Sequence, residues 1–315
     1  MRSLRIIFMG TPDFAVASLR ALIEHTYNVV GVITAPDRPA GRGQAMRQSA
    51  VKEYAVSQDI KVLQPTNLKS EAFLEELKQL EANLQIVVAF RMLPKVVWQM
   101  PEYGTFNLHA SLLPDYRGAA PINWAIINGE ERTGVTTFFI DEKIDTGAII
   151  AQTECFIRKE DSAGTLYDKL MTLGAELVIK TVQHIEKGEV TTIDQKQVDA
   201  IKEAPKLSKE NSEIKWDRPV KAIYDQIRGL SPYPVAWTTL INNTESFYLK
   251  VYKASYTEVE HSLSPGKLLI DKKSIKVAVN GGYISLEEIQ LPGKRKMGVA
   301  DVLNGLKLDK NAHVL

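Results

Sequence analysis

Residues 4–34 read LRIIFMGTPDFAVASLRALIEHTYNVVGVIT, and this stretch decides the class of fold. It opens with a short apolar run, residues 4–9, which ends at a glycine and is typical of a buried strand. Residues 12–24 then carry apolar side chains at helical spacing, with a proline suited to the first helical turn. Residues 28–34 return to the pattern of a strand. A strand, a helix and a second strand in this order predict a parallel sheet.

The same alternation continues for most of the chain. Further strands are predicted at residues 60–63, 84–90, 104–110 and 134–140. Further helices are predicted at residues 49–58, 70–80, 120–128 and 163–187. Strands that alternate with helices imply a mostly parallel sheet that is covered on both faces. We therefore predict a doubly wound, Rossmann-like α/β domain over residues 1–193.

The character of the sequence changes after this domain. Residues 194–208 are polar and rich in lysine, and they are expected to form a linker. Residues 209–315 follow with a short helix and then short alternating segments that are separated by Pro-Gly and Gly-Gly turns. The strand segments are 236–241, 246–254, 266–270, 275–280 and 283–291. About five strands of this kind suit a small all-β, OB-like barrel domain.

Composition is that of an ordinary globular protein. The chain has 315 residues, of which 44% are hydrophobic and 24% are charged, and its net charge is +1. Cys155 is the single cysteine, so an internal disulfide is impossible, and no Cys/His cluster predicts a metal site. The apolar run near the N-terminus is too short for a membrane span or a signal peptide. We expect a cytoplasmic monomer that needs neither a membrane nor a metal.

Charge is distributed unevenly along the chain. Residues 201–315 carry 18 Lys and Arg against 13 Asp and Glu, a balance of +5. Residues 1–200 carry 21 against 25, a balance of −4. A basic C-terminal half fits an anionic partner such as nucleic acid. An imbalance of this size is also common by chance, and the count alone favours chance.

The first strand-to-helix turn, FMGTPDFA at residues 8–15, is a place where phosphates often bind. It holds one glycine instead of the G-x-G-x-x-G fingerprint, and the chain has no Walker A sequence. A dinucleotide-dependent dehydrogenase is therefore disfavoured.

Residues 35–48, APDRPAGRGQAMRQ, hold two prolines, two glycines and three arginines. Such a stretch is expected to be a long loop without helix or strand. Arg38, Arg42 and Arg47 suit contacts with phosphates or bases. On the residues alone, a solvated surface loop is the favoured alternative.

Residues 106–118, FNLHASLLPDYRG, begin as a strand and end in an abrupt turn. Asn107 and His109 share a face, because strand side chains repeat every two residues. At the carboxyl end of a strand, where open α/β sheets bind ligands, both side chains can donate to one developing oxyanion. Asp145, in the turn sequence Ile-Asp-Thr-Gly, is expected to face His109 and to orient its ring. A structural Asn and His and an ordinary turn Asp are the alternatives.

The combination NLHASLLPDYRGAAPINW, followed by IDTG, resembles the 10-formyltetrahydrofolate-dependent formyltransferases. By that resemblance, Asn107, His109 and Asp145 are the catalytic residues. The resemblance also implies that the folate contacts the SLLP segment, which consists of Ser111, Leu112, Leu113 and Pro114. 10-Formyltetrahydrofolate is then the formyl donor and co-substrate, and no metal takes part.

Within this superfamily the chain is similar to the branch that formylates initiator Met-tRNA. The similarity rests on FMGTPDFA, on PDRPAGRG at residues 36–43 and on IRGLSPYPVAW at residues 227–237. It implies that Arg38, Arg42 and Arg47 contact the tRNA, as does the C-terminal barrel. Amino-sugar and glycinamide-ribonucleotide acceptors are the main alternatives, although neither kind of enzyme has the PDRPAGRG loop in this form. A non-catalytic RNA-binding protein is another, but it has no need of the Asn–His–Asp set.

Overall fold

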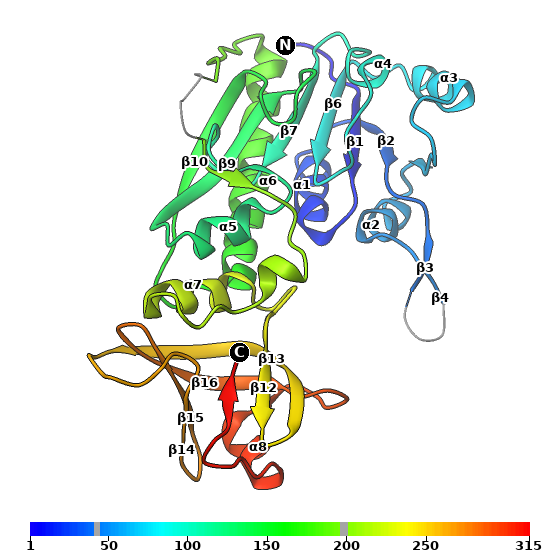
Figure 1. Cartoon of the computed structure of the whole chain (residues 1–315). Coiled ribbons are helices and arrows are strands. Elements are labelled where there is room, and N and C mark those ends of the chain that lie inside the picture. The colour runs from blue at the N-terminus through cyan, green and yellow to red at the C-terminus, as the bar shows by residue number, and fades with distance from the viewer. Residues whose placement is uncertain (41–44, 196–200) are drawn as a thin grey trace. The chain divides into compact units, whose positions relative to one another are not determined.

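The computed structural model describes residues 1–40, 45–195 and 201–315, and Figure 1 shows its elements. Contacts group the chain into two compact units. Unit 1 consists of Met1–Gly118, Thr133–Phe156 and Tyr167–Glu203, and unit 2 consists of Ala119–Arg132, Ile157–Leu166 and Ala204–Leu315. The predicted fold class is confirmed, because a mainly parallel α/β sheet is followed along the chain by an antiparallel, nearly closed barrel.

A seven-stranded sheet organises unit 1, in the order β10-β9-β7-β6-β1-β2-β5. Its strands are β1 (Ile6–Gly10), β2 (Val29–Ile33), β5 (Val62–Leu63), β6 (Leu84–Val88), β7 (Thr105–His109), β9 (Arg132–Phe139) and β10 (Ile149–Phe156). The pairs from β5 to β7 are parallel, and β9 runs antiparallel to β7. Strands β1 and β6 are buried along their whole length, as expected where both faces of a parallel sheet are covered.

Helices cover the two faces of this sheet, so the arrangement is doubly wound. The helices that lie wholly or mostly in unit 1 are α1 (Asp13–Glu24), α2 (Ala50–Ser57), α3 (Glu71–Gln79), α4 (Lys95–Trp98) and α6 (Ala163–Lys187). One face packs against α3 and α4, whose Phe73, Leu77 and Val97 share a buried cluster with Ile7 and Met9 of β1. On the other face, α6 approaches β7 so closely that a Cβ added at its Gly174 would lie 2.7 Å from Leu108.

Gly10 serves packing at the turn between β1 and α1. A Cβ at this position would lie 2.5 Å from the Ala15 Cβ and 2.9 Å from the Val88 carbonyl oxygen. The single glycine of the FMGTPDFA turn is therefore explained by the close approach of helix and strand.

An antiparallel sheet organises unit 2, in the order β14-β15-β16-β13-β12-β18, with β17 beside β16. Its strands are β12 (Ala236–Asn242), β13 (Glu245–Glu258), β14 (Leu268–Ile270), β15 (Ile275–Val279), β16 (Gly282–Gln290), β17 (Met297–Gly298) and β18 (His313–Val314). The Val314 amide donates to the Gly266 carbonyl at 2.9 Å, and Lys267 forms a bridge with His313. These contacts join the two edges of the sheet and nearly close the barrel.

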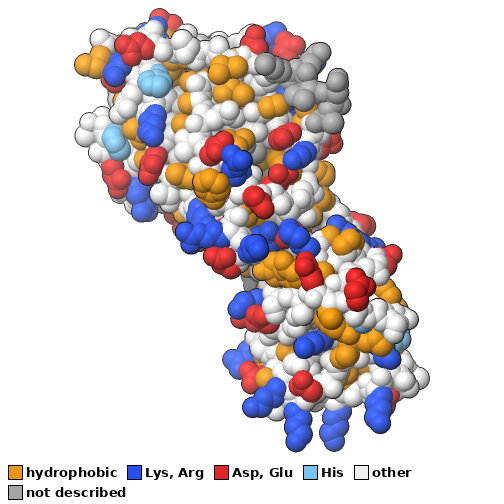
Figure 2. Space-filling model, turned by 90° about the vertical axis from the view of Figure 1, so that its left-hand side faces the viewer, with side chains coloured by type: hydrophobic (Ala, Val, Ile, Leu, Met, Phe, Trp, Pro, Cys, Tyr) orange, Lys and Arg blue, Asp and Glu red, His pale blue; other side chains and the backbone are white. Residues whose placement is uncertain are grey.

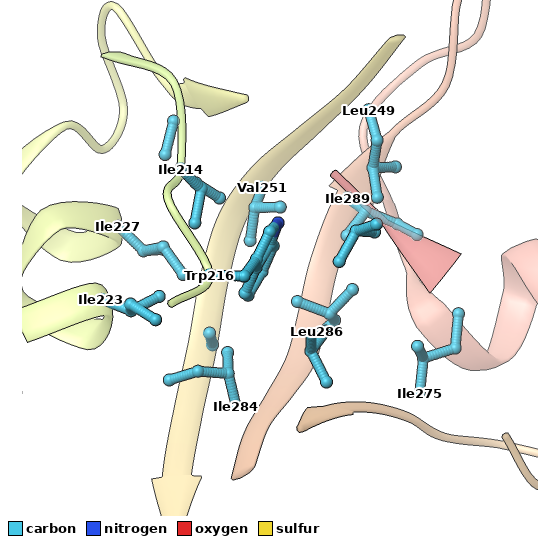
Figure 3. Packing of buried hydrophobic residues seen from close by; sticks show 14 of the residues in the cluster. Ile214, Trp216, Ile223, Ile227, Leu249, Val251, Ile275, Ile284, Leu286 and Ile289 are labelled. Carbon is cyan, nitrogen blue, oxygen red and sulfur yellow. The ribbon is translucent and has the colours of Figure 1, made fainter. Parts of the chain in front are cut away.

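The barrel encloses a hydrophobic core that is centred on an indole (Figure 3). Trp216 is buried among Ile223, Val251 and Leu286, and its Nε1–H donates to the Thr238 hydroxyl at 2.9 Å. The helices of this unit are α5 (Pro121–Ile127), α7 (Val220–Gly229) and α8 (Val299–Gly305), with a 3-10 turn, η1 (Glu210–Ser212). A buried indole with its N–H paired contributes a large apolar area and leaves no unsatisfied donor.

Each of the two units is built from several separate segments of the chain. Helix α5 belongs to unit 2, where the Asn123 amide donates to the Gly229 carbonyl of α7 at 2.8 Å. The predicted domain limits, 1–193, 194–208 and 209–315, stay a prediction. Residues 196–200 of the predicted linker lie outside the described residues, and β11 (Glu203–Ala204) pairs with β8 (Arg117–Gly118).

The prediction that residues 35–48 contain no strand is wrong. β3 (Arg38–Ala40) and β4 (Ala45–Arg47) form an antiparallel ribbon, in which Arg38 lies opposite Arg47 and Pro39 lies opposite Met46. A proline fits a two-stranded ribbon, because each strand has a free edge where no backbone N–H is needed. Strand β10 was also not predicted, because most of its residues are partly or fully exposed and its sequence, IIAQTECF, lacks an apolar run.

Candidate active site

The site lies at the carboxyl end of β7. Asn107 and His109 project from the same face of this strand, Asn107 half-buried and His109 only 7% exposed. Thr105, on the same face, donates to the Trp98 carbonyl of α4 at 2.7 Å, which shows that this is the α3–α4 side of the sheet. Among the described residues, the Asn107 amide has no hydrogen-bond partner. A half-buried amide without a partner is available to a ligand.

His109 is held by two groups. Its Nε2 lies 2.8 Å from the Tyr116 carbonyl oxygen, and its Nδ1 lies 3.7 Å from Oδ2 of Asp145. Because a carbonyl can only accept, Nε2 must carry the proton of this bond. The carboxylate is too far from Nδ1 for a direct hydrogen bond but near enough for charge attraction. The ring is therefore oriented by a carbonyl at Nε2 and by a carboxylate on the side of Nδ1.

Asp145 lies in the turn between β9 and β10, with a φ of 55°. Its Oδ2 accepts a hydrogen bond from the Gly118 N–H at 2.9 Å, and its backbone carbonyl accepts one from the Gln195 side-chain amide at 2.9 Å. Aspartate tolerates the left-handed region better than most residues. The sequence predicted that Asn107, His109 and Asp145 lie together. In the structure, the His109 imidazole lies beside the Asp145 carboxylate, and Asn107 shares a face of β7 with His109.

A hydroxyl inside the sheet holds the SLLP turn. Thr136 of β9 is fully buried, and its Oγ1–H donates to the Ser111 carbonyl at 2.6 Å. The same oxygen accepts from the Leu113 amide at 3.2 Å and from the Gln152 side chain at 2.9 Å. One hydroxyl thus uses its donor and one lone pair on this turn, and its other lone pair on Gln152 of β10.

The four SLLP side chains divide into two kinds. Ser111 is fully buried, and its hydroxyl donates to the Asp115 carbonyl within the turn. Leu113 is buried in a small cluster with Phe138 and Ile149. Leu112 and Pro114 are only half-buried. Ser111 and Leu113 therefore stabilise the turn, and Leu112 and Pro114 are its partly accessible side chains.

The β3–β4 ribbon holds two of the three predicted tRNA contacts. Arg38 and Arg47 are exposed and directly opposite each other, whereas Arg42 lies outside the described residues. Figure 1 shows the ribbon extending beyond α2, away from β7. Like charges in opposite positions repel, so an anion between these two arginines is favourable.

The base of the ribbon is tied to the sheet by Asp37. Its carboxylate accepts from Lys52 at 2.6 Å and from Gln64 at 2.7 Å. These hydrogen bonds, Lys52 first, hold the pKa of Asp37 below its ordinary value of 3.8.

Other kinds of site find no support in the described part of the chain. It contains no group of three His, Cys, Asp or Glu residues that could hold a metal ion. In the same residues, no helix is long and apolar enough to cross a membrane. On the face drawn in Figure 2, basic side chains are interspersed with acidic ones instead of forming a continuous band.

Sequence reasoning missed the residues that support the site. They are Thr136, Gln152 and Gln195. None belongs to a motif, and Gln195 is 50 residues away from the aspartate that it contacts. The half-buried Gln195 follows a run of exposed residues, but this difference is visible only in the structure, so no signal in the sequence could have identified it.

Comparison with known proteins agrees with this geometry. Residues 4–182 match the formyl transferase family, and residues 206–307 match the formyl transferase C-terminal domain. The chain belongs to the formyl transferase family. The membership of the formyltransferases that was predicted from the NLHASLLP motif is therefore confirmed.

Individual relatives are similar over the full length. A methionyl-tRNA formyltransferase of Flavobacterium johnsoniae is 59% identical, with 100% of both chains covered. One of Parabacteroides distasonis is 56% identical over 96% of both chains. The solved structure of WlaRD, a sugar 3N-formyl transferase, shares the fold with a TM-score of 0.66 and 22% identity, covering 94% of this chain and 100% of its own.

Proposed function

We propose that this chain transfers a formyl group from 10-formyltetrahydrofolate to the α-amine of methionine on initiator Met-tRNA. The observation that carries the proposal is the Asn107 amide, which has no hydrogen-bond partner in the described part of the chain, beside the His109–Asp145 pair at the end of β7. The acceptor is supported by full-length relatives that bear the name methionyl-tRNA formyltransferase. The donor is supported by the WlaRD structure, which was solved in the presence of 5-N-formyl-THF.

In the proposed reaction, the amine nitrogen bonds to the formyl carbon, and a tetrahedral intermediate with an anionic oxygen forms. The Asn107 side chain donates a hydrogen bond to that oxygen. His109, with Nε2–H held by the Tyr116 carbonyl, contributes the positive charge of its protonated ring. A single donor of this kind typically stabilises such a transition state by about 3–4 kcal/mol.

Protons must also move for the reaction to balance. The acceptor begins as an ammonium and ends as an amide, so its nitrogen loses two protons, and the departing folate nitrogen takes up one. We assign the first acceptance to Asp145, whose carboxylate is 13% exposed and lies beside the imidazole. The second proton leaves the acceptor nitrogen after its bond to the formyl carbon has formed, and it is taken up by the folate nitrogen as the bond between that nitrogen and the formyl carbon breaks.

The folate is proposed to lie against the SLLP turn. Leu112 and Pro114 offer half-buried apolar surface, while Ser111 and Leu113 hold the backbone in place. The half-buried Asn107 is on the strand that leads into this turn. The hydrogen-bond donor Asn107 and the SLLP turn therefore suit a flat ligand whose formyl carbon lies near the end of β7.

The tRNA is proposed to contact the ribbon through Arg38, Arg42 and Arg47, and to contact the barrel. We further propose a catalytic domain over residues 1–193, a linker over 194–208 and a tRNA-binding domain over 209–315. The matches to the N- and C-terminal formyl transferase families support this division. We propose that the enzyme acts as a monomer in the cytoplasm.

The test is an assay of the purified protein with 10-formyltetrahydrofolate and charged initiator Met-tRNA, with charged elongator Met-tRNA in parallel. We expect acid-stable formyl-methionine on the initiator only. Formylation of both would contradict the proposed selectivity. Transfer to neither, combined with transfer to an amino-sugar nucleotide or to glycinamide ribonucleotide, would replace the acceptor and keep the chemistry.

A further inference from the structure

We infer that Gln195 and Arg117 are positioning residues that hold the Asp145 carboxylate against His109. This inference rests on the proposed function. Gln195 is in the segment that follows α6, and Arg117 is the first residue of β8. Neither side chain is assigned a role by the family motifs, and both converge on the Asp145 turn.

The Gln195 amide is fully used. Its Nε2 donates one hydrogen bond to the Asp145 carbonyl and a second to the Gly147 carbonyl, both at 2.9 Å. Its Oε1 accepts from Arg117, at 3.1 Å from Nε and 2.5 Å from Nη2. Carbonyls only accept and guanidinium groups only donate, so the chemistry allows a single orientation of this amide. A carboxylate at position 195 would place oxygens against both carbonyls.

The segment that carries Gln195 is itself fixed to the sheet. Ile193 and Ile149 exchange two backbone hydrogen bonds, at 2.8 and 2.9 Å, next to the start of β10. The side chains of residues 191–194 are exposed, whereas that of Gln195 is half-buried. The backbone bonds therefore deliver one inward side chain to the Asp145 turn.

The contacts close a ring around the carboxylate. Asp145 accepts the Gly118 N–H with Oδ2, and Gly118 follows Arg117 directly in the chain. Arg117 holds Gln195, and Gln195 returns to the Asp145 backbone. Both the side chain and the backbone of the aspartate are thus tied to the same turn. Because Asp145 has a φ of 55°, loss of the bonds to its carbonyl frees the peptide to rotate and carries the carboxylate with it.

The direct test is Gln195→Ala, measured by steady-state formylation kinetics. We expect kcat to fall by about 10- to 100-fold, because a displacement of about 1 Å at a reacting group costs this much. KM for folate and for tRNA should change by less than about threefold, because neither residue is placed against the substrates. Arg117→Met, which removes the other half of the ring, should give a similar loss.

A double-mutant experiment separates positioning from plain structural support. In an Asp145→Asn background, Gln195→Ala should cost little further activity, because the group that it positions has already been neutralised. A full additive loss in that background would overturn the inference.

Gln226→Ala is the matched control, because this buried amide also donates to a backbone carbonyl, that of Glu213 at 2.9 Å, but in unit 2. It should lower Tm and leave kcat unchanged.

A spectroscopic readout makes the inference independent of the reaction. The imidazole 15N resonances of His109 report on its surroundings, and in Gln195→Ala they should move toward those of Asp145→Asn. If the resonances of Gln195→Ala and Arg117→Met match the wild type, positioning is wrong whatever the assay shows. If the resonances move as expected but the wild type formylates no Met-tRNA, the proposed function fails and the positioning role stands.

Discussion

The end of β7 and the β3–β4 ribbon are both polar segments of unit 1, but they are built in opposite ways. His109 is 7% exposed and contacts two other segments of the chain, Tyr116 and Asp145. Arg38 and Arg47 are exposed and face each other, and the ribbon is tied down at its base by Asp37. Bond-making chemistry needs atoms that are held in place, whereas recognition of a large anion needs charges within reach.

The largest effect is expected for Asn107→Ala. We expect kcat to fall by about 100- to 1,000-fold, equivalent to about 3–4 kcal/mol, because a donor to the oxyanion is lost. Tm should stay near the wild-type value, because this amide has no partner among the described residues. Single-turnover formylation and thermal melting measure the two quantities.

Asn123→Ala is the matched control for this variant. Its amide donates to the Gly229 carbonyl of α7 at 2.8 Å, so its removal should cost about 1 kcal/mol of stability and no turnover. If the two asparagines exchanged these outcomes, the end of β7 would be a structural feature and the proposed site would be wrong.

A smaller effect is expected for Thr136→Val. The substitution removes a buried hydroxyl and leaves the Leu113 amide without its acceptor, which should destabilise the fold by about 1–3 kcal/mol. Because the SLLP turn loosens, KM for folate should rise as well. Denaturant unfolding and steady-state kinetics measure both.

The neighbouring Thr137→Val offers a comparison. Its hydroxyl lies 2.8 Å from that of Thr181, which also donates to the Leu177 carbonyl, so the bond is buried but away from the turn. This variant should lose stability and keep its KM for folate. Equal changes in KM for both variants would remove the link between the SLLP turn and the folate.

The ribbon should respond in KM for tRNA alone. Replacing Arg38 and Arg47 together by alanine should raise that KM by about tenfold and reduce its salt dependence by about one unit of slope per lost phosphate contact. Formylation of a small amine acceptor should not change. Lys180→Ala, an exposed charge on α6, is the control for net charge. A loss with the small acceptor as large as the loss with tRNA would contradict the proposed role of the ribbon.

The smallest effect is expected for Asp37→Asn, and it should depend on pH. The pKa of Asp37 is lowered in the folded state by hydrogen bonds from Lys52 and then Gln64, so its contribution to stability is present above its ordinary pKa of 3.8. That contribution is lost as the pH falls through the lowered value. The wild type should therefore melt slightly higher than the variant at pH 7, and the two should converge in acid. A difference in Tm that is constant with pH would show that this carboxylate is not the cause.

Local sequence patterns predicted most of the elements. The helix predicted at residues 163–187 is α6, with the same bounds, and strand β7 at 105–109 lies within the predicted 104–110. These predictions succeeded because helical and strand periodicities are set by residues within a few positions of each other. The ribbon was missed because it is short and polar, and β10 was missed because only Ile149 and Cys155 of its residues are buried.

The catalytic candidates and the acceptor class were predicted from the sequence, because the residue spacing of the motif can be recognised without a structure. The structure added the residues that hold these candidates in place. Tyr116 faces His109 because the turn after β7 folds back, and Gln195 meets Asp145 across 50 residues of sequence. Hydrogen bonds between distant segments leave no periodic signal, because each depends on where the sheet brings two backbones together. The candidate site residues were therefore predicted from the chain and stay a prediction, whereas their orientation required the folded protein.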